Sequence, residues 1–260
     1  MPAVTIGLAV YNAERYLKEC VDSIIAQTFK DFEVIAVLDA PQDESETVLR
    51  RCADTRFRIL INEKNIGQGP SANIILREAQ CSLIARMDAD DIMLPERIER
   101  QFAYMTEHPE IAVLGSHFDL IDQHGKVTEQ GPGYPLDHEG IVETFRVKGV
   151  MHHPTVMYRK EKIMEAGAYD PELRYAEDLS LWLRCMIRGH KFANLPDTLL
   201  HYRIHNEQLM SSKLEQTLQA IDHLYAQYGL QIWGENAPDY VGGINKWHRL
   251  WRRIKRKLSN

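Results

Sequence analysis

The feature that most constrains the fold is a series of four short apolar segments, each separated from the next by a stretch with helical spacing. The apolar segments cover residues 3–10, 32–38, 56–62 and 82–87. Between them, residues 13–27, 43–53 and 71–80 carry apolar side chains three and four positions apart. Near-continuous apolar strands that alternate with helices are typical of a parallel sheet covered on both faces. The sequence therefore predicts an α/β fold with a Rossmann-like, mostly parallel central sheet flanked by helices.

The second half of the chain is less regular. Residues 95–109 suit a helix with Pro95 in its first turn, and residues 111–122 suit a strand. Residues 123–138 are rich in Gly and Pro and are expected to form a loop. Helical spacing returns at residues 177–190 and again after Ser212, which suits an N-cap. These elements predict a second, more variable half attached to the same sheet.

Bulk properties narrow the class of protein. No window reaches the roughly 18 consecutive apolar residues of a membrane-spanning helix. The N-terminus lacks the basic lead and small-residue cleavage site of a signal peptide. The four cysteines are scattered and form no C-x-x-C pair, as expected for reduced thiols. We therefore expect a cytoplasmic protein.

Three carboxylates follow the fourth apolar segment, at Asp88, Asp90 and Asp91. In open α/β sheets, ligands bind beyond the carboxyl ends of the strands. If the segment is extended, Asp88 and Asp90 point the same way and can hold Mg²⁺ or Mn²⁺, which prefer oxygen ligands. The alternative is a solvated acidic turn with Asp91 as a helix N-cap. The preceding apolar strand favours the cation site.

Two common phosphate and cation motifs are absent. No G-x-x-x-x-G-K-[ST] sequence occurs, and residues 65–73, NIGQGPSAN, lack the lysine of a P-loop. An EF-hand loop that begins at Asp88 would need a glycine at its sixth position, where the sequence has Met93. A divalent cation without a P-loop lysine indicates a diphosphate ligand that is held in another way.

Six segments in order, from about Val4 to Ser212, resemble the motifs of an inverting family 2 glycosyltransferase with the GT-A fold. They are GLAVYNAERYL, VIAVLDAPQDES, NIGQGPSAN, DADD, EDLSLWLR and YRIHNEQLMS. The second segment departs from the family pattern, because Leu38 stands where the first residue of a double aspartate is usual and only Asp39 remains. The order and spacing of all six make the resemblance specific.

The resemblance implies a nucleotide-sugar donor site with a divalent cation, Mn²⁺ or Mg²⁺. Asp90 is expected to ligate the metal directly, Asp88 to contact the ribose or the metal through water, and His205 to be a further ligand. Asp39 is expected to accept a hydrogen bond from a uracil-like base that stacks on Tyr11. Arg203 is expected at the diphosphate, although it can instead pair with a surface carboxylate, and His205 can be an ordinary loop residue. The full set of expected donor-binding residues is Ala9, Tyr11, Asn12, Asp39, Asn65, Gly67, Asn73, Asp88, Ala89, Asp90 and Arg203.

The resemblance also implies a catalytic carboxylate at the start of a helix. The acceptor hydroxyl needs a general base within hydrogen-bond distance. Asp178 is the expected base and Glu177 is the second candidate, since a helix N-terminus favours negative charge. An ordinary pair of helix-start acids is the alternative. His152, His153 and Trp182 are expected acceptor-binding residues, although a structural histidine pair and a core tryptophan explain the same residues.

The C-terminal tail differs in charge from the rest of the chain. Residues 246–260 hold seven Lys and Arg and no acid, so the remaining chain has 24 basic against 37 acidic residues, a net charge of −13. Apolar residues fall on one face of a helix in this tail, at Trp247, Leu250, Trp251, Ile254 and Leu258. Such a helix is typical of a membrane interface. A helix packed on the body is the alternative, and the acidic body disfavours nucleic acid.

Together these inferences predict a GT-A catalytic domain in residues 1–211, with a nucleotide-sugar-binding half in 1–115 and an acceptor-binding half in 116–211. Residues 212–260 are expected to form a helical extension with a basic amphipathic tail in 245–260. The expected function is transfer of a sugar, with a UDP-sugar favoured, to a saccharide or lipid-linked acceptor of bacterial cell-surface polysaccharide or lipopolysaccharide synthesis. The enzyme is expected at the inner face of the membrane as a peripheral protein. The alternatives are a sugar nucleotidyltransferase and an inactive glycan- or nucleotide-binding module.

Overall fold

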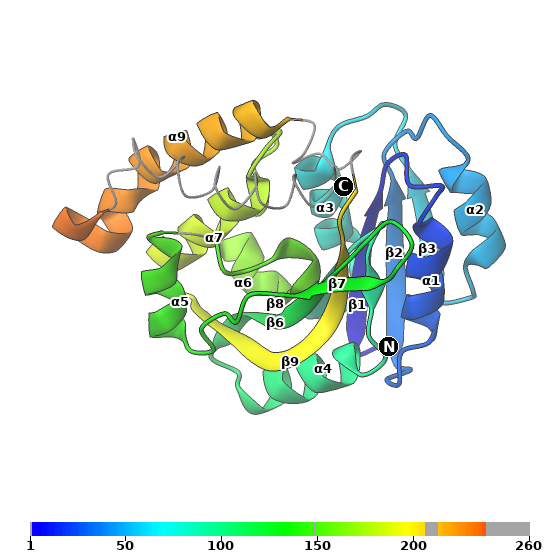
Figure 1. Cartoon of the computed structure of the whole chain (residues 1–260), viewed down its shortest axis with the longest axis horizontal. Coiled ribbons are helices and arrows are strands. Elements are labelled where there is room, and N and C mark those ends of the chain that lie inside the picture. The colour runs from blue at the N-terminus through cyan, green and yellow to red at the C-terminus, as the bar shows by residue number, and fades with distance from the viewer. Residues whose placement is uncertain (1, 148, 206–212, 238–260) are drawn as a thin grey trace.

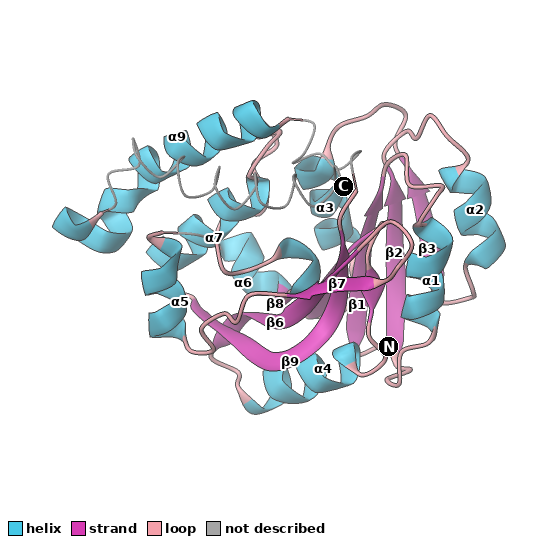
Figure 2. Cartoon of the chain, in the orientation of Figure 1, coloured by secondary structure: helices cyan, strands magenta, loops and turns pink. Residues whose placement is uncertain are grey.

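A computed structural model describes residues 2–147, 149–205 and 213–237. Within these residues one nine-stranded sheet runs through the molecule in the order β3-β2-β1-β4-β8-β6-β9-β5, with β7 paired to β6. Figure 1 and Figure 2 show the sheet with helices packed around it. The predicted α/β class is confirmed.

The elements alternate regularly in the first half of the chain and less so in the second. In chain order they are β1 (Val4–Val10), α1 (Leu17–Ile25), β2 (Phe32–Leu38), α2 (Ser45–Cys52), β3 (Phe57–Ile61), α3 (Gln68–Glu78), β4 (Leu83–Asp88), β5 (Ile92–Met93), α4 (Arg97–Glu107), β6 (Ile111–Ile121), β7 (Val127–Gln130), α5 (His138–Phe145), the 3₁₀ turn η1 (His153–Thr155), β8 (Met157–Arg159), α6 (Lys160–Glu165), α7 (Glu177–Ile187), β9 (Lys191–Arg203), α9 (Leu214–Trp233) and the 3₁₀ turn η2 (Gly234–Asn236).

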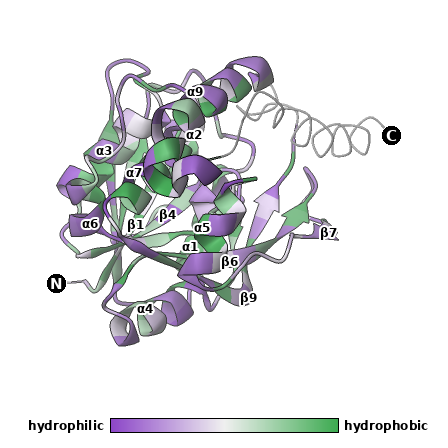
Figure 3. Ribbon diagram, turned by 90° about the vertical axis from the view of Figure 1, so that its left-hand side faces the viewer, coloured by the Kyte–Doolittle hydropathy of each residue, from purple (hydrophilic) through white to green (hydrophobic). Residues whose placement is uncertain are grey.

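The four strands predicted from apolar runs form the parallel part of the sheet. β1 lies between β2 and β4 and is parallel to both, with Ala9 opposite Val37 on one side and Asp88 on the other. β1, β2 and β4 are almost wholly buried. Figure 3 shows β1 and β4 in the interior of the molecule, with helices around them. Burial on both faces explains why these strands read as continuous apolar runs rather than as alternating ones.

Helices cover both faces of this parallel part. Figure 1 shows α1 and α2 on one side of the strands and α3 on the other. α3 approaches closely because Gly7 has no side chain: a Cβ there would lie 2.7 Å from Cγ2 of Ile75. Any larger residue at position 7 would push α3 away from β1.

The second half extends the same sheet with mixed strand directions. β8 is antiparallel to both β4 and β6, and β6 runs parallel to β9 along almost its whole length. The prediction of a loop at residues 123–138 is wrong in part, because β7 pairs with β6 in a hairpin. All four residues of β7 are exposed, so no apolar alternation marks the strand in the sequence.

The C-terminal helix α9 packs against α7. Leu183 of α7 lies in one buried cluster with Leu224 and Tyr225 of α9, and the Tyr225 hydroxyl donates to the Phe145 carbonyl at 2.7 Å. None of the helices in the described residues is both long and apolar enough to cross a membrane. Ser212 and the basic tail at 245–260 lie outside the described residues. The predicted division at residue 115 falls inside β6, so the two halves share a strand.

Candidate active site

The carboxyl ends of the parallel strands bring three of the expected donor residues together. Asp39 directly follows β2 and Asp88 is the last residue of β4. Ala9 lies between them near the end of β1, paired with Asp88. Parallel strands end at one edge of a sheet, and that edge is where ligands bind in α/β folds.

Asp39 holds the loop that follows β3. Its carboxylate is buried and accepts hydrogen bonds from the backbone N–H of Ile66 at 2.9 Å and of Gly67 at 2.8 Å. Asn62 donates its side-chain amide to the same carboxylate at 2.8 Å. Asn65 donates to the Asp39 carbonyl at 3.4 Å. The expected base-binding residue is therefore already an anchor for the loop. Its Oδ1 accepts two of these bonds and its Oδ2 accepts one, so Oδ2 keeps a lone pair for a further donor.

Tyr11 and Asn12 follow β1 at the same edge. The Tyr11 ring is 49 % exposed, which leaves its face open to a stacking partner. Asn12 has a φ of +47° and its Oδ1 accepts from the Gln42 backbone N–H at 2.7 Å. Asn12 thereby ties the β1 turn to the turn after β2.

Asn73, another of the expected donor residues, uses its side chain for contacts within the protein. Its side-chain amide donates to the Tyr169 carbonyl at 2.7 Å, and its Oδ1 accepts from the Tyr169 backbone N–H at 3.0 Å. Both ends of the side chain are thus used to join α3 to the segment before α7. The contacts favour a structural role over direct contact with the donor.

Two neighbouring side chains contact the same oxygen of Asp88. The guanidinium Nη2 of Arg86, a residue only 1 % exposed, lies 2.7 Å from Asp88 Oδ1. The Gln68 side-chain amide donates to the same Oδ1 at 3.1 Å. Burial raises the pKa of Asp88, and the positive charge of Arg86 opposes that rise. Arg86 therefore offsets part of the repulsion among the clustered carboxylates.

The residues after Asp88 form a turn rather than an extended strand. β4 ends at Asp88, and Ala89, which is buried, and Asp90, which is partly exposed, follow in the turn. The Asp91 N–H points to the Asp88 carbonyl at 3.4 Å. The expected strand-like alternation is therefore wrong, although the Asp88 and Asp90 side chains are both partly exposed, by 22 % and 26 %. The N-cap alternative for Asp91 is wrong as well, because α4 begins at Arg97 after Glu96.

Asp91 points into the protein. It is fully buried, its Oδ1 accepts from the Arg203 backbone N–H at 2.9 Å, and its Oδ2 has no hydrogen-bond partner among the described residues. Burial, together with the charges of Asp90 and Asp88, raises its pKa well above the usual range. Asp91 thus serves to anchor the turn to β9.

Arg203 fixes the turn from the other side. Its side chain is fully buried and donates to the Asp90 carbonyl at 2.7 Å, to the Asp122 carbonyl at 3.1 Å and to the Glu19 carboxylate at 2.7 Å. A guanidinium so enclosed does not present its donors to a diphosphate in this structure. Its contacts favour a role in holding the Asp90 turn against α1 and β9.

Asp90, in the turn after β4, and His205, just after β9, form a pair that can hold a cation. His205 Nε2 lies 2.9 Å from Asp90 Oδ2. The carboxylate and the imidazole would serve as two ligands of a divalent cation. No group of three or more His, Cys, Asp and Glu side chains in the described ranges has the geometry of a complete metal site. The pair fits a cation whose remaining ligands are water and substrate phosphates, as Mg²⁺ prefers.

Glu177 and Asp178 begin α7 on the far side of the same edge. Glu177 is 6 % exposed, and burial together with Asp178 raises its pKa to about 8. Burial raises the pKa of Asp178 to about 6, with Asp88 adding to the rise, while the Leu179 backbone N–H donates to its Oδ1 at 2.7 Å. α3 reaches this pair through Gly69, where a Cβ would lie 3.5 Å from the Glu177 Cβ.

The expected acceptor residues are mostly enclosed. The His152 ring packs 4.3 Å from Phe118 and 5.2 Å from Tyr202, between centroids, and burial lowers its pKa to about 4. His153 is 6 % exposed with Nε2 at 2.7 Å from the Tyr169 hydroxyl. Trp182 is 1 % exposed and crosses Phe192 edge to face, which favours the core over a sugar platform.

Tyr202 of β9 lies beside His152, with the ring centroids 5.2 Å apart. Burial raises its pKa well above the usual range, and Asp91, Asp90, Asp88 and Asp178 add to the rise. One phenol therefore experiences the carboxylates of both the β4 turn and α7. Sequence reasoning missed Gln68, Arg86 and Tyr202, although all three stand inside or beside motifs that were singled out.

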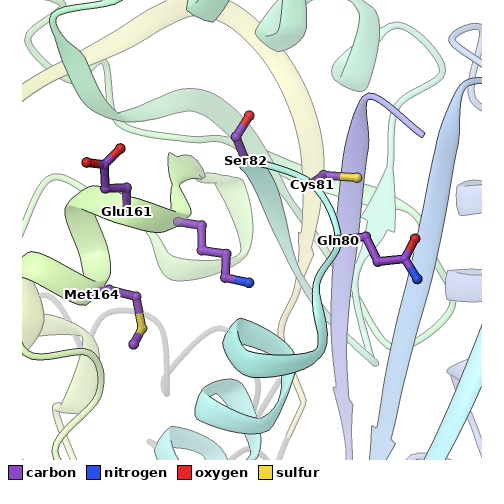
Figure 4. Close-up of a pocket in the computed structure, with 6 residues that line it drawn as sticks. Gln80, Cys81, Ser82, Glu161 and Met164 are labelled. Atoms are coloured by element: carbon purple, nitrogen blue, oxygen red, sulfur yellow. The ribbon is translucent and has the colours of Figure 1, made fainter. Parts of the chain in front are cut away.

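A shallow hollow of about 350 Å³ lies elsewhere, between the segment before β4 and α6. Figure 4 shows it, and its lining residues are Gln80, Cys81, Ser82, Lys160, Glu161 and Met164. This is the amino end of β4, opposite to the edge that carries Asp88. The hollow is therefore separate from the carboxylate site.

The sequence matches a known family. The family model described as glycosyl transferase family 2 matches residues 5–167. The amylovoran biosynthesis glycosyltransferase AmsE of Erwinia amylovora is 39 % identical over 203 residues, covering 76 % of this chain and 75 % of that protein. The O-antigen biosynthesis glycosyltransferase WbnJ of Escherichia coli is 32 % identical over 215 residues, covering 81 % of this chain and 83 % of that protein.

Solved structures share the fold. Residues 1–349 of S. aureus TarS in complex with UDP-GlcNAc superpose with a TM-score of 0.71 at 20 % identity, covering 86 % of this chain and 66 % of that one. The mannosyltransferase PcManGT from Pyrobaculum calidifontis, in complex with GDP-Man and Mn²⁺, gives a TM-score of 0.67 at 16 % identity, covering 87 % of this chain and 64 % of that one. The predicted GT-A fold is confirmed.

Proposed function

The chain belongs to glycosyl transferase family 2, and from that premise we propose that it is a metal-assisted, inverting glycosyltransferase that uses a nucleotide-diphospho-sugar. One observation supports this more than any other. The first turn of α3 touches both carboxylate groups: Gln68 donates to Asp88 at 3.1 Å, and a Cβ at the next residue, Gly69, would lie 3.5 Å from the Glu177 Cβ. A donor held on one side can therefore meet a base on the other.

The donor side of the site is built to hold a nucleotide diphosphate. The exposed Tyr11 ring can stack on a base, and Asp39 can accept from a base N–H. Asp90 and His205 would hold a divalent cation, with Asp88 beside them. That cation, when bound, stabilises the charge that the leaving diphosphate gains. A UDP-sugar is the favoured donor, in line with the UDP-GlcNAc complex of the TarS structure.

The α7 side of the site is built to move a proton. The acceptor oxygen forms a bond to the anomeric carbon while the bond from that carbon to the diphosphate oxygen breaks, and the diphosphate leaves with the electron pair. The proton of the acceptor hydroxyl goes to Asp178. A base with a pKa of about 6 is ionised at neutral pH and still holds a proton well enough to take it in the transition state. Attack from the face opposite the leaving group inverts the anomeric centre.

The names of two relatives support one class of acceptor. Those named for amylovoran and O-antigen biosynthesis support a saccharide or lipid-linked glycan acceptor in bacterial cell-surface polysaccharide or lipopolysaccharide synthesis. The basic amphipathic sequence at 245–260 supports peripheral contact with an anionic membrane, and so a place at the inner face of the cell membrane. His152, beside Tyr202, is the best placed of the expected acceptor residues.

The test is a transfer assay with the purified protein, Mn²⁺ and a panel of UDP-, GDP- and dTDP-sugars, read by nucleotide diphosphate release and by product analysis. We expect slow donor hydrolysis or transfer with one donor, and loss of both with a chelator. Binding of no nucleotide diphosphate, together with no turnover of any donor, would contradict the proposal.

A further inference from the structure

The loop held by Asp39 continues directly into a contact with Asp88. Asp39 binds the backbone N–H groups of Ile66 and Gly67, and the next residue, Gln68, donates its side-chain amide to Asp88 Oδ1 at 3.1 Å. Gly67 has a φ of +96°, a conformation that strains any residue with a side chain. The path from Asp39 to Gln68 is therefore short and fixed at each step.

This path bridges the donor site. β1 lies between β2 and β4, so the ends of β2 and β4 are two strand spacings apart, about 10 Å. Asp39 is at one end of that gap and Asp88 at the other. The loop therefore runs between two strand ends at the edge where ligands bind in α/β sheets.

The contact also decides which oxygen of Asp88 faces the ligand. Arg86 Nη2 lies 2.7 Å from Oδ1, and Gln68 binds the same Oδ1. Arg86 is 1 % exposed and belongs to β4, so its side chain is expected to keep its position when a ligand binds. Rotation of the carboxylate would take Oδ1 away from the Gln68 hydrogen bond and from the Arg86 ion pair, so the two neighbours favour one orientation, in which Oδ2 is left for the ribose or for a metal-bound water.

We propose that Gln68 is a positioning residue that sets the orientation of the Asp88 carboxylate and couples base recognition at Asp39 to diphosphate binding at the Asp88–Asp90 turn. The proposal rests on the donor site proposed above. The neutral amide of Gln68 supplies a hydrogen-bond donor without adding charge, whereas Arg86 supplies a positive charge.

Three variants test the coupling. Gln68→Met keeps the length and removes the donor, Gln68→Glu keeps the length and places a second carboxylate beside Asp88, and Gln231→Met on the exposed part of α9 is the matched control. Isothermal titration measures binding of uridine, of UDP, and of UDP with Mn²⁺. We expect Gln68→Met to weaken binding of UDP with Mn²⁺ about tenfold, as for the loss of one hydrogen bond to a charged group, while uridine binding changes less than twofold. Gln68→Glu should weaken it further, and Gln231→Met should match the wild type.

An equal loss for uridine and UDP, or no loss for either, would overturn the coupling. Ligand-free crystal structures of the wild type and of Gln68→Met give a second reading that does not depend on nucleotide binding. We expect the Asp88 carboxylate to rotate in the variant while Arg86 stays in place, and an unmoved carboxylate would overturn the positioning role. If the wild type bound neither uridine nor UDP, the proposed function would fail while the crystal structures would still decide the role of Gln68.

Discussion

The two sides of the site treat their carboxylates differently. On the β4 turn, Asp88 lies 2.7 Å from the Arg86 guanidinium and Asp90 lies 2.9 Å from His205. On α7, Glu177 and Asp178 make no ion pair with any residue that the structure describes, and burial raises their pKa values to about 8 and about 6. The first pair touches basic side chains, and the second is enclosed without them.

The difference teaches how one edge of a sheet can serve two kinds of chemistry. On the β4 turn the positive charge of Arg86 opposes the burial that raises the pKa of Asp88, which suits a site that holds a cation and phosphates. Carboxylates that are buried without such partners titrate near neutral pH, which suits proton transfer. The division follows the fold, because the first pair belongs to the parallel half and the second to a helix of the mixed half.

The largest expected effect is on the α7 side. Asp178→Asn should lower kcat roughly a thousandfold, within the range for loss of a general base. Binding of the nucleotide diphosphate should change little, because Asp178 does not belong to the donor side. Steady-state kinetics and titration calorimetry on the same preparation separate the two. A variant that kept kcat and lost donor affinity would reverse the roles of the two sides.

The β4 turn should respond in the opposite way. Asp90→Asn should weaken binding of UDP with Mn²⁺ by roughly a hundredfold, as expected for loss of a metal contact, and should weaken uridine binding little. Calorimetry with and without Mn²⁺ measures this. The matched control is Asp22→Asn, whose carboxylate pairs with Lys18 on the surface. If Asp90→Asn and the control bound UDP with Mn²⁺ equally tightly, the turn would not be the cation site.

Glu177→Gln tests the electrostatics without any substrate. A carboxyl group with a pKa raised on folding from 4.5 to about 8 destabilises the folded protein progressively as pH rises through that window. The variant cannot ionise, so it should gain stability relative to the wild type by up to about 1.4 kcal/mol for each pH unit in the window. Urea unfolding at pH 5, 6, 7 and 8 measures this, with the exposed Glu172→Gln as control. A difference that is constant with pH would show that Glu177 is not buried as a neutral acid.

The smallest effect concerns Tyr11. Tyr11→Ala should weaken UDP binding by roughly tenfold, since stacking of a base on an aromatic ring contributes about 1–3 kcal/mol. Tyr11→Phe keeps the ring and should bind like the wild type. Neither should alter kcat at saturating donor. Equal losses in both variants would assign the effect to the hydroxyl rather than to stacking.

The parallel half could be predicted closely from the sequence, because buried strands such as β1 and β2 show their burial as continuous apolar runs. The position of the β4 carboxylates followed from the same runs. The second half could be predicted less well. β7 has no buried residue, so its pairing with β6 leaves no pattern in the composition.

Side-chain partners were the least predictable part of the site. Arg203 was expected at a diphosphate because arginine commonly binds phosphate, yet it lies buried between the Asp90 carbonyl and Glu19, residues far from it in the chain. Asn73 likewise binds the backbone of Tyr169, 96 positions away. A motif shows that a residue matters but does not show which long-range contact it makes.

The role of Asp178 as the base is tested by the pH dependence of kcat at saturating donor, from pH 5 to pH 9. If Asp178 accepts the proton, kcat should rise about tenfold per pH unit up to an apparent pKa near 6 and then level off. The residual kcat of Asp178→Asn should not show this rise with pH. A wild-type kcat that stays constant between pH 5 and pH 7 would contradict the division of roles between the α7 pair and the β4 turn.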